Sequence, residues 1–401
     1  MINIYQQPQV FTPAGNDMSY VVKSDNIAQT NFKYIFDIYI NGVFVTQELR
    51  SQHPTYGTGV LDIKKIVSPS VLSDFLLTDT DGVTKNTQSF CTVQVRFGEQ
   101  YGSTVTNYQD LTRSNTIYAF AGSIKTLDFV DWDYHDYYAG DVDQGKFLTT
   151  RSRVKHVIKQ SQKDWLSIYT NSSGNVETIG IHTYDHTGTG IQVFEFLNPF
   201  SSLGQSADRF IKFAAGWNLN DISPASVTVG AQPCLTANVA YFEVHVVDQA
   251  AAPTAEILKV YVEQSCAWGD EYDLHFQNSL GFQESFRFTK WTSKNEDYDR
   301  KNFKKPTGTY GNTSFTVTTS DRGWETYYSK TANRWILRSD WINDEMIPWV
   351  GEIIGTKQAY LDINNELIPV IIENTNYEQI TKQTNQLRNL ELTVRLPDDY
   401  R

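Results

Sequence analysis

The sequence predicts a mainly β protein with several domains, in which β-sandwich modules are followed by a small α+β module. The chain contains 23 Tyr, 22 Phe and 9 Trp against 3 Met, and aromatic side chains favour half-buried pleated surfaces over helical bundles. Short alternating apolar segments recur between clusters of Gly, Asn, Pro and Ser, which is typical of strands and turns. The 401 residues exceed the roughly 250–300 at which one core stops growing, so we expect two or three domains.

An N-terminal β-sandwich is expected over residues 1–125. Alternate positions from Phe32 to Ile40 are apolar, as in a strand with one buried face. Asn41-Gly42 follows, and this dipeptide is the strongest short signal for a two-residue hairpin because both positions require a positive φ. The segment is therefore predicted to form a β-hairpin.

A short helix or crossover is predicted after this hairpin. Ser68 is a favourable N-cap residue, and Pro69 would occupy the first helical position. Residues 102–116 are polar and rich in turn-forming side chains. We therefore expect them to form a linker or an insertion near the end of the first domain.

A larger β-sandwich or jelly-roll-like body is expected over residues 126–304, where strand-like segments follow one another at short intervals. Its last two strands lie in YDLHFQNSLGFQESFRF, residues 272–288. Asn278 and Gly281 are predicted to form the turn between them, since Asn and Gly tolerate backbone conformations that other residues avoid. We expect this hairpin to be part of a buried core rather than a ligand platform.

The α+β module is expected over residues 305–401. Ser339 and Asp340 are predicted to begin a helix, and Pro348 to kink it or restart it as a first-turn proline. Three strands are predicted to follow, the first two joined by an Asn-Asn turn. Because the preceding strands form complete modules, residues 1–304 are expected to fold without the C-terminal module.

The chain carries a formal net charge of −12 and has no dense cluster of Lys and Arg. An acidic surface opposes the phosphate neutralisation that nonspecific DNA or RNA binding requires, so a nucleic-acid reader is not expected. Cys91, Cys234 and Cys266 are far apart and odd in number, which predicts buried thiols rather than disulfides or a metal site. Neither a secretory signal nor a spanning segment is expected, which predicts a soluble protein made in a reducing compartment.

The sequence lacks the common motifs of nucleotide-binding proteins and hydrolases, and we expect neither enzyme activity nor a cofactor. His182 and His186 have the i, i+4 spacing of two metal ligands on a helix. The alternation before them predicts a strand, which does not bring positions i and i+4 together, so they are only weak metal-ligand candidates. Asp79, Asp81 and Gly82 resemble the start of a calcium loop, but the later ligands do not follow, and an Asp-Gly turn is the better interpretation.

The most suggestive segment is DFVDWDYHDYYAGDVDQG, residues 128–145, which combines six aspartates with aromatic side chains. Two of its carboxylates would suffice to act on a glycosidic bond held against aromatic rings. Alternatively, the rings provide contact area and the aspartates provide charge complementarity in a protein interface. We favour the interface, for which the candidate residues are Asp131, Trp132, Tyr134, Tyr137, Tyr138, Trp341 and Trp349.

Three parts of the chain carry a resemblance to a known family: SDNIAQTNFKYIFDIYI (24–40) with YGTGVLDIKKIV, FQNSLGFQESFRF (276–288), and PVIIENTNYEQITKQTNQLRNLELTVRL (369–396). They resemble structural tail proteins of tailed bacteriophages that infect Bacteroidetes, particularly the crAss-like podoviruses. The N-x-L-G turn of that family is present here as Asn278, Leu280 and Gly281. The sequence departs from the family at Phe282, where a second glycine is common.

The resemblance implies a non-enzymatic virion protein of the tail that is assembled in the cytoplasm of the bacterial host. Such a protein would form a homo-oligomeric ring, a dodecamer by portal symmetry, in the ring stack or hub that connects the portal to the tail and lines the DNA conduit. Its partners would be the portal and the neighbouring ring or hub proteins. The alternative is a carbohydrate-binding or glycan-degrading tail protein that uses residues 128–145.

Overall fold

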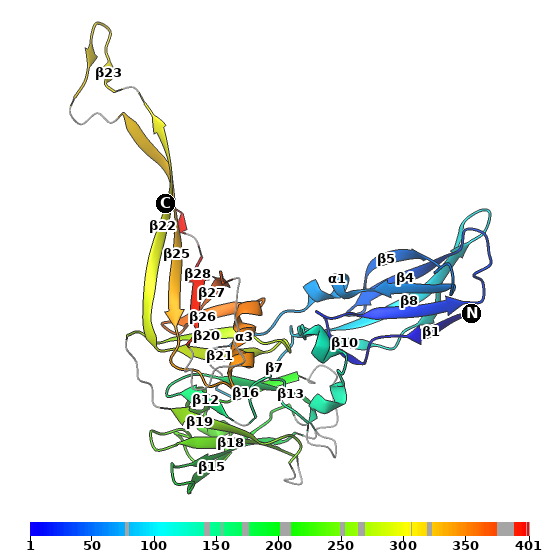
Figure 1. Cartoon of the computed structure of the whole chain (residues 1–401), viewed down its shortest axis with the longest axis horizontal. Coiled ribbons are helices and arrows are strands. Elements are labelled where there is room, and N and C mark those ends of the chain that lie inside the picture. The colour runs from blue at the N-terminus through cyan, green and yellow to red at the C-terminus, as the bar shows by residue number, and fades with distance from the viewer. Residues whose placement is uncertain are drawn as a thin grey trace. The chain divides into compact units, whose positions relative to one another are not determined.

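The computed structural model describes residues 1–76, 80–139, 145–153, 155–170, 176–200, 210–248, 253–263, 269–305, 307–318, 323–374, 389–397 and 399–400. Strands in several sheets dominate, with short helices between them (Figure 1), so the predicted mainly β fold class is confirmed. Cys91 and Cys234 are buried free thiols, as predicted. Asp79, Cys266, and Asp141 and Asp143 of the acidic segment lie outside the described residues.

Compactness divides the chain into two units. Unit 1 contains residues 1–265, 275–286 and 345–357, and unit 2 contains residues 266–274, 287–344 and 358–401. A short segment from the last seventh of the chain therefore returns to unit 1. The sequence predicts three domains that fold independently, residues 1–125, 126–304 and 305–401. Independent folding of these segments stays a prediction.

The N-terminal part of unit 1 is a sandwich of two sheets. One sheet has the order β1-β3-β6 and the other the order β2-β10-β8-β4-β5, with β9 also pairing with β8. The bounds are β1 Ile2–Gln6, β2 Phe11–Pro13, β3 Ser19–Ser24, β4 Lys33–Ile40, β5 Val43–Ser51, β6 Thr58–Asp62, β8 Phe90–Tyr101, β9 Thr106–Arg113 and β10 Ile117–Phe120. Buried side chains from both sheets, such as Tyr20, Phe36 and Val95, form one core.

The predicted hairpin at Asn41-Gly42 is confirmed. β4 and β5 pair antiparallel up to Ile40↔Val43, and Asn41 and Gly42 have φ values of 51° and 77°. Both residues therefore occupy the left-handed region that a type I′ turn requires. Asn41 Oδ1 also accepts a 2.9 Å hydrogen bond from Thr92 N, which ties the turn to β8.

The short helix predicted after the hairpin is present as helix α1 (Lys64–Val67) and the 3₁₀ turn η1 (Ser68–Ser70), with Pro69 in the first turn of η1 as predicted. The predicted N-cap is wrong, because Val67 and not Ser68 precedes η1 as its N-cap residue. The linker prediction is also wrong. Residues 102–116 are not a linker, because most of them form β9, which pairs with β8. Nearly all side chains of β9 are exposed, so the apolar alternation that identifies a strand in a sequence is absent.

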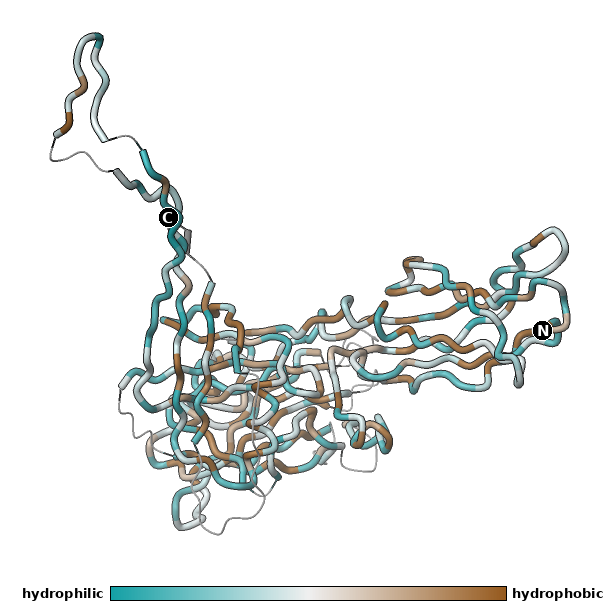
Figure 2. The backbone as a smooth tube through the Cα atoms, turned by 45° about the horizontal axis from the view of Figure 1, so that its top comes forward, coloured by the Kyte–Doolittle hydropathy of each residue, from teal (hydrophilic) through white to brown (hydrophobic). Residues whose placement is uncertain are grey.

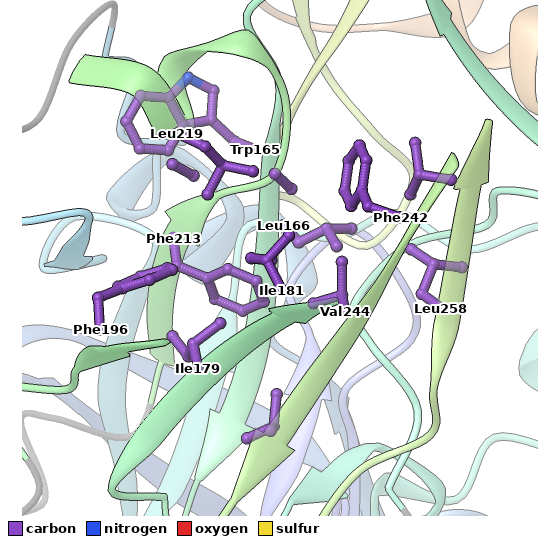
Figure 3. Close-up of a cluster of buried hydrophobic side chains, with 14 of the residues drawn as sticks. Trp165, Leu166, Ile179, Ile181, Phe196, Phe213, Leu219, Phe242, Val244 and Leu258 are labelled. Atoms are coloured by element: carbon purple, nitrogen blue, oxygen red, sulfur yellow. The ribbon is translucent and has the colours of Figure 1, made fainter. Parts of the chain in front are cut away.

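A second sandwich forms the central part of unit 1. Its sheets have the orders β11-β13-β16-β7 and β12-β19-β18-β14-β15-β17. The bounds are β7 Val83–Lys85, β11 Tyr138–Ala139, β12 His156–Lys159, β13 Trp165–Thr170, β14 Thr178–Tyr184, β15 Gly190–Leu197, β16 Phe210–Ala214, β17 Val227–Val229, β18 Tyr241–Val247 and β19 Leu258–Glu263. Short helices connect them: α2 Thr126–Phe129, η2 Tyr134–Tyr137, η4 Trp217–Asp221 and η5 Pro224–Ser226. Leu166 and Phe213 of one sheet meet Ile181 and Val244 of the other in a common core (Figure 3).

The predicted strand-turn-strand of residues 272–288 is present as two strands, β20 Tyr272–Gln277 and β21 Gln283–Phe288. Asn278 Oδ1 accepts a 2.9 Å hydrogen bond from Phe282 N, and Gly281 has a φ of 87°. A Cβ at Gly281 would lie 2.5 Å from backbone atoms of Ala121 and Gly122. The predicted turn residues Asn278 and Gly281 are therefore confirmed, and only glycine fits the second position.

The main helix of the C-terminal region begins later than predicted. Helix α3 spans Ile347–Gly355, with Pro348 in its first turn as expected, whereas Ser339 and Asp340 do not begin a helix. Ser339 instead follows directly after a strand. Its hydroxyl accepts a 2.7 Å hydrogen bond from Leu390 N. The hydroxyl therefore binds a distant backbone N–H and does not cap a helix.

Unit 2 contains strands in the order β26-β27-β28-β25-β22, with β29 also pairing with β25. The bounds are β22 Lys290–Lys304, β23 Thr309–Tyr310, β24 Phe315–Thr316, β25 Trp324–Arg338, β26 Ala359–Ile363, β27 Glu366–Ile372, β28 Glu391–Arg395 and β29 Asp399–Tyr400. The predicted Asn-Asn turn between β26 and β27 is confirmed, since Asn364 and Asn365 have φ values of 57° and 63°.

Strands β22 and β25 form a long ribbon that the sequence does not predict. They pair antiparallel from Lys290↔Arg338 to Lys304↔Trp324. From Trp324 to Ser329, β25 has only β22 as a partner among the described residues. We call residues 298–331 the arm. Hydrophilic and hydrophobic residues are intermixed along it (Figure 2).

Replacing Gly281 with Ala is expected to lower the thermal unfolding midpoint far more than replacing Gly42 with Ala. Both glycines have a positive φ, which costs an L-residue roughly 1–2 kcal/mol. At Gly281 the added methyl group would also meet backbone atoms at 2.5 Å, whereas nothing lies within 4 Å of the same position at Gly42. Equal shifts in the two variants would contradict the close packing of the 278–281 turn.

Candidate functional site

The acidic segment singled out in the sequence lines a pocket on unit 1. The pocket has a volume of about 280 Å³. One side is formed by residues 124–137, and the other side includes residues of the β20–β21 turn and of α3. Its charged lining residues are Lys125, Asp128, Asp131, Asp133, Asp136 and Glu352. The pocket is therefore strongly acidic.

Local hydrogen bonds fix two of these aspartates. Asp133 precedes η2 and accepts a 3.0 Å hydrogen bond from His135 N, and the same oxygen lies 2.7 Å from His135 Nδ1. These hydrogen bonds hold the pKa of Asp133 below its ordinary value, so its carboxylate is charged at neutral pH. Asp136 forms a 2.9 Å ion pair with Lys146. The carboxylates of Asp128 and Asp131 are exposed to solvent.

The aromatic residues of the segment anchor it to unit 1. Trp132 is buried, its indole Nε1 donates a 3.2 Å hydrogen bond to Phe11 O, and its ring stacks on Tyr137 at a centroid distance of 5.0 Å. Tyr134 lies 5.6 Å from Phe11 between ring centroids, and Tyr138 packs against the same buried aromatic cluster. The tyrosines are half-buried. These predicted interface residues therefore fix the shape of the segment and leave Asp128 and Asp131 exposed.

Glu352 completes the pocket and was not predicted from the sequence. Its carboxylate accepts hydrogen bonds from Ser279 N at 2.9 Å, Ser279 Oγ at 3.0 Å and Thr150 Oγ1 at 2.8 Å. Burial raises the pKa of Glu352 and the charge of Glu284 adds to this, although the hydrogen bonds act in the opposite direction. A lone acidic residue in the apolar helix IPWVGEIIG is the signal that identifies it, because a carboxylate on such a helix needs partners.

The arrangement supports two kinds of chemistry. A carboxylate of lowered pKa, Asp133, and a carboxyl of raised pKa, Glu352, line one pocket, and glycosidases use such a difference to separate a general acid from a base or nucleophile. The same acidic surface also suits cationic groups of a protein partner. The donors to Glu352 lie in the β20–β21 turn and at Thr150, so its carboxylate also fastens that turn to α3.

The two tryptophans outside the segment differ in exposure. Trp341 is 57% exposed and stays a candidate interface residue. Trp349 is 1% exposed, its ring contacts Phe276 and Phe286, and its indole donates a hydrogen bond to the carboxylate of Glu284. The prediction for Trp349 is therefore corrected: it is a core residue, because α3 turns this side chain into unit 1.

The weak metal-ligand candidates have different surroundings. His182 lies on β14 and stacks on His245 of β18, with ring centroids 4.1 Å apart. His186 lines another cavity, of about 540 Å³, together with Asp185 and Trp217. Within the part of the chain that the structure describes, no group of three or more His, Cys, Asp or Glu residues is placed to hold a metal ion.

A buried set of charged residues joins the hairpin and α3 to the central sandwich, and nothing in the sequence indicated it. Arg151 donates two 2.6 Å hydrogen bonds to Asp164, and both side chains are 0% exposed. Arg151 Nε lies 3.4 Å from Glu284, which also accepts a 2.8 Å hydrogen bond from Asn278 Nδ2. We call the following residues the buried network: Arg151, His156, Asp164, Glu284 and Trp349.

Arg151 and Asp164 of the buried network keep each other charged. Burial opposes ionisation of Asp164, but the charge of Arg151 outweighs this, and the pKa of Asp164 lies below its ordinary value. Burial likewise lowers the pKa of Arg151, but the charges of Asp164 and Glu284 raise it above the ordinary value. Removing one partner of a buried pair leaves the other charge without compensation. The network is therefore sensitive to substitution.

His156 belongs to the same network, with Nε2 3.6 Å from Asp164. Burial lowers the pKa of His156 and the positive charge of Arg151 lowers it further, although Asp164 acts in the opposite direction. The imidazole therefore stays neutral at pH values at which an exposed histidine takes up a proton.

Comparisons with known proteins add little to this geometry. Neither a family model nor a curated relative matches the chain. Among solved structures, the chain is similar to a protein of Corynebacterium diphtheriae that is named as membrane anchored, with 11% sequence identity and a TM-score of 0.17. The alignment covers 67% of this chain and 60% of that chain, less than two thirds of its length. A likeness at this TM-score carries no argument about function. In this chain, no described helix combines the length and the apolar character needed to cross a membrane.

Replacing Arg151 with Met is expected to destabilise the chain by about 3–5 kcal/mol, because the carboxylates of Asp164 and Glu284 stay buried without their countercharge. The matched control is Arg113→Met, which removes a similar two-bond pair with Asp110 at the surface. Exposed pairs contribute little to stability, so this variant should unfold near the wild-type urea midpoint. Similar midpoints for both variants would show that the fold does not depend on the network.

The stability of the chain is expected to fall between about pH 7 and pH 5, in part because of His156. In the unfolded chain a histidine binds a proton near its ordinary pKa of ~6.5, whereas the lowered pKa of His156 keeps it neutral in the fold. The unfolded state then binds more protons, so acidification favours unfolding. His156→Gln should flatten the dependence of the urea midpoint on pH, and His186→Gln, at an exposed site, should not. An unchanged slope for His156→Gln would contradict this assignment.

Proposed function

We propose that the chain is a non-enzymatic structural protein of a bacteriophage virion, a subunit of a tail ring or hub that connects the portal to the tail and surrounds the DNA conduit. The observation that carries the proposal is the arm, residues 298–331. It supports the proposal because a ring subunit must reach and hold its neighbours, and because the resemblance of the sequence points to tail proteins.

The arm leaves its own side chains uncovered. Every residue of β22 from Lys294 to Lys304 is exposed, and Tyr298, Trp324 and Tyr327 are 51%, 64% and 64% exposed. A two-stranded ribbon is only marginally stable in water unless a third strand or a packed face supports it. An arm of this kind is therefore best explained by a neighbouring protein surface that covers it in an assembly.

Unit 1 offers a second exposed strand. β5 is the last strand of its sheet, and its residues Val43, Phe44 and Val45 are 66%, 51% and 48% exposed. Exposed edge strands with apolar side chains tend to pair with or be covered by other chains. A closed ring needs contacts in which one surface meets a different surface of the next subunit, and two unlike exposed features on one chain suit that requirement.

The charge of the chain agrees with a conduit role. A net charge of −12 disfavours the cation–phosphate contacts that would hold duplex DNA in place. A genome that must pass through a ring moves more freely along an acidic or neutral wall than along a basic one.

Shortening the arm is expected to abolish ring formation and leave the body folded. Residues 299–330 are replaced by Asn-Gly, which joins the paired positions Tyr298 and Thr331 through a two-residue turn. As a control, Asn-Gly replaces Asn364-Asn365, which is already a turn. Negative-stain images of the wild-type and control proteins should show closed rings, alone or with the portal protein, and the shortened protein should stay monomeric. Rings formed by the shortened protein would contradict the role of the arm, and the absence of rings from the wild type would contradict the proposed function.

A glycan-binding or glycan-degrading tail protein is the second candidate. The pocket favours it, because Asp133 and Glu352 differ in the direction of their pKa shifts and Trp132 and Tyr137 lie beside them. Release of reducing sugar from host capsule by the purified protein, lost in Asp133→Asn or Glu352→Gln, would establish this activity in place of a purely structural role. We expect no release.

A further inference from the structure

We propose that the arm of one copy docks on the acidic surface of a second copy of this chain. The acidic surface is defined by four exposed residues, Leu127, Asp128, Val130 and Asp131, of which the two aspartates also line the pocket. The inference rests on the proposed function, because it names the contact by which neighbouring subunits hold one another.

The arm has the opposite charge to the rest of the chain. Residues 298–331 contain six Lys and Arg against three Asp and Glu, in a chain whose net charge is −12. The arm also exposes large rings, among them Trp324 and Tyr327, and at its tip Tyr310, which is 75% exposed. It therefore presents cations and aromatic faces together.

The acidic surface presents the matching chemistry. Leu127 and Val130 are 85% and 77% exposed, although both are apolar and lie within or directly after the short helix α2. They alternate with the exposed carboxylates of Asp128 and Asp131. Apolar residues with this exposure, set among carboxylates, are typical of a contact surface whose partner is cationic and aromatic.

The pocket is small and is formed by residues that are already held in place. Its volume of about 280 Å³ lies just below the ~300–1,000 Å³ range of small-molecule sites. Trp132, Tyr137 and Glu352 are held in place by the contacts described above, so the pocket is formed before a partner arrives. A side chain of the arm that enters it would not need to reorganise it.

A protein surface fits the arm better than DNA does. Its cations are held against the arm itself: Arg300 lies 5.0 Å above the ring of Tyr298, and Lys305 forms a 2.8 Å ion pair with Glu325. The cations of the arm are spread among its own rings and carboxylates, so they would neutralise few DNA phosphates. The acidic remainder of the chain would also repel a DNA duplex. The same features favour a mixed acidic and apolar protein surface.

Paired charge reversal tests the contact. The arm variant carries Lys301→Glu and Lys304→Glu, and the surface variant carries Asp128→Lys and Asp131→Lys. The four side chains are exposed, so the folds should persist, which circular dichroism checks. The control variant carries Asp17→Lys and Lys65→Glu, exposed residues outside both surfaces. Light scattering as a function of protein concentration reports assembly.

Each single-surface variant should need at least tenfold more protein than the wild type or the control to assemble. An equimolar mixture of the two variants, and a chain carrying all four substitutions, should assemble at within threefold of the wild-type concentration. Restoration only in the four-substitution chain would show that the arm docks on its own copy and would overturn the proposal.

Three other results would also overturn it. The arm variant assembling like the wild type would exclude this contact but leave the ring role intact. A wild-type protein that is monomeric alone and still joins rings with portal protein would likewise exclude this contact and leave the ring role intact. Micromolar binding of the wild type to a duplex oligonucleotide, lost in the arm variant, would identify the arm as a DNA-binding element.

Discussion

The guanidinium of Arg151 is fully buried, and the two carboxylates that it meets, Asp164 and Glu284, belong to the central sandwich and to the β20–β21 hairpin. Burying such charges costs several kcal/mol per ion unless their hydrogen bonds are satisfied. Asp164 meets this condition because its carboxylate also accepts hydrogen bonds from Trp165 N and Ser285 N. Glu284 meets it because its carboxylate accepts hydrogen bonds from Asn278 and from the indole of Trp349. The sandwich, the hairpin and α3 must therefore be in place together. A chain that ends at residue 304 lacks Trp349, which counts against the expectation that residues 1–304 fold alone.

The buried network also determines the shape of the candidate site. Trp349 and Glu352 are three residues apart on α3, and this spacing places them on one side of a helix. Trp349 binds Glu284 in the core, and Glu352 receives hydrogen bonds from Ser279 in the turn. The short helix α3 thus contacts the hairpin at two points. Because Ser279 and Glu352 also line the pocket, these contacts hold one side of the pocket in place. A rigid body with a preformed acidic surface is suited to receive a partner without loss of order.

Local signals in the sequence were sufficient where one or two residues determine the backbone. Asn41-Gly42, Asn278 with Gly281, and Pro348 were placed correctly, because a positive φ or a missing N–H restricts the conformation at those positions alone. The arm and β9 were missed because exposed strands lack apolar alternation. The buried network and Glu352 were missed because their partners come from distant segments, and charge pairing across such distances leaves no pattern in a single sequence. Trp349 was misplaced for the same reason, since an aromatic residue suits an interface and a core equally well.

Buried charges hold the body together, whereas we propose that the arm needs a neighbour, and hydrogen exchange tests this difference most directly. In the isolated monomer, the backbone amides of β13, β16 and the β20–β21 hairpin should exchange slowly, because they open only with the buried network, whereas those of residues 298–305 and 324–330 should exchange within seconds. In the rings that we propose, the arm amides should become protected. Protection of the arm in the monomer, equal to that in the proposed ring, would contradict the proposed role of the arm, because the arm would then be stable without a neighbour.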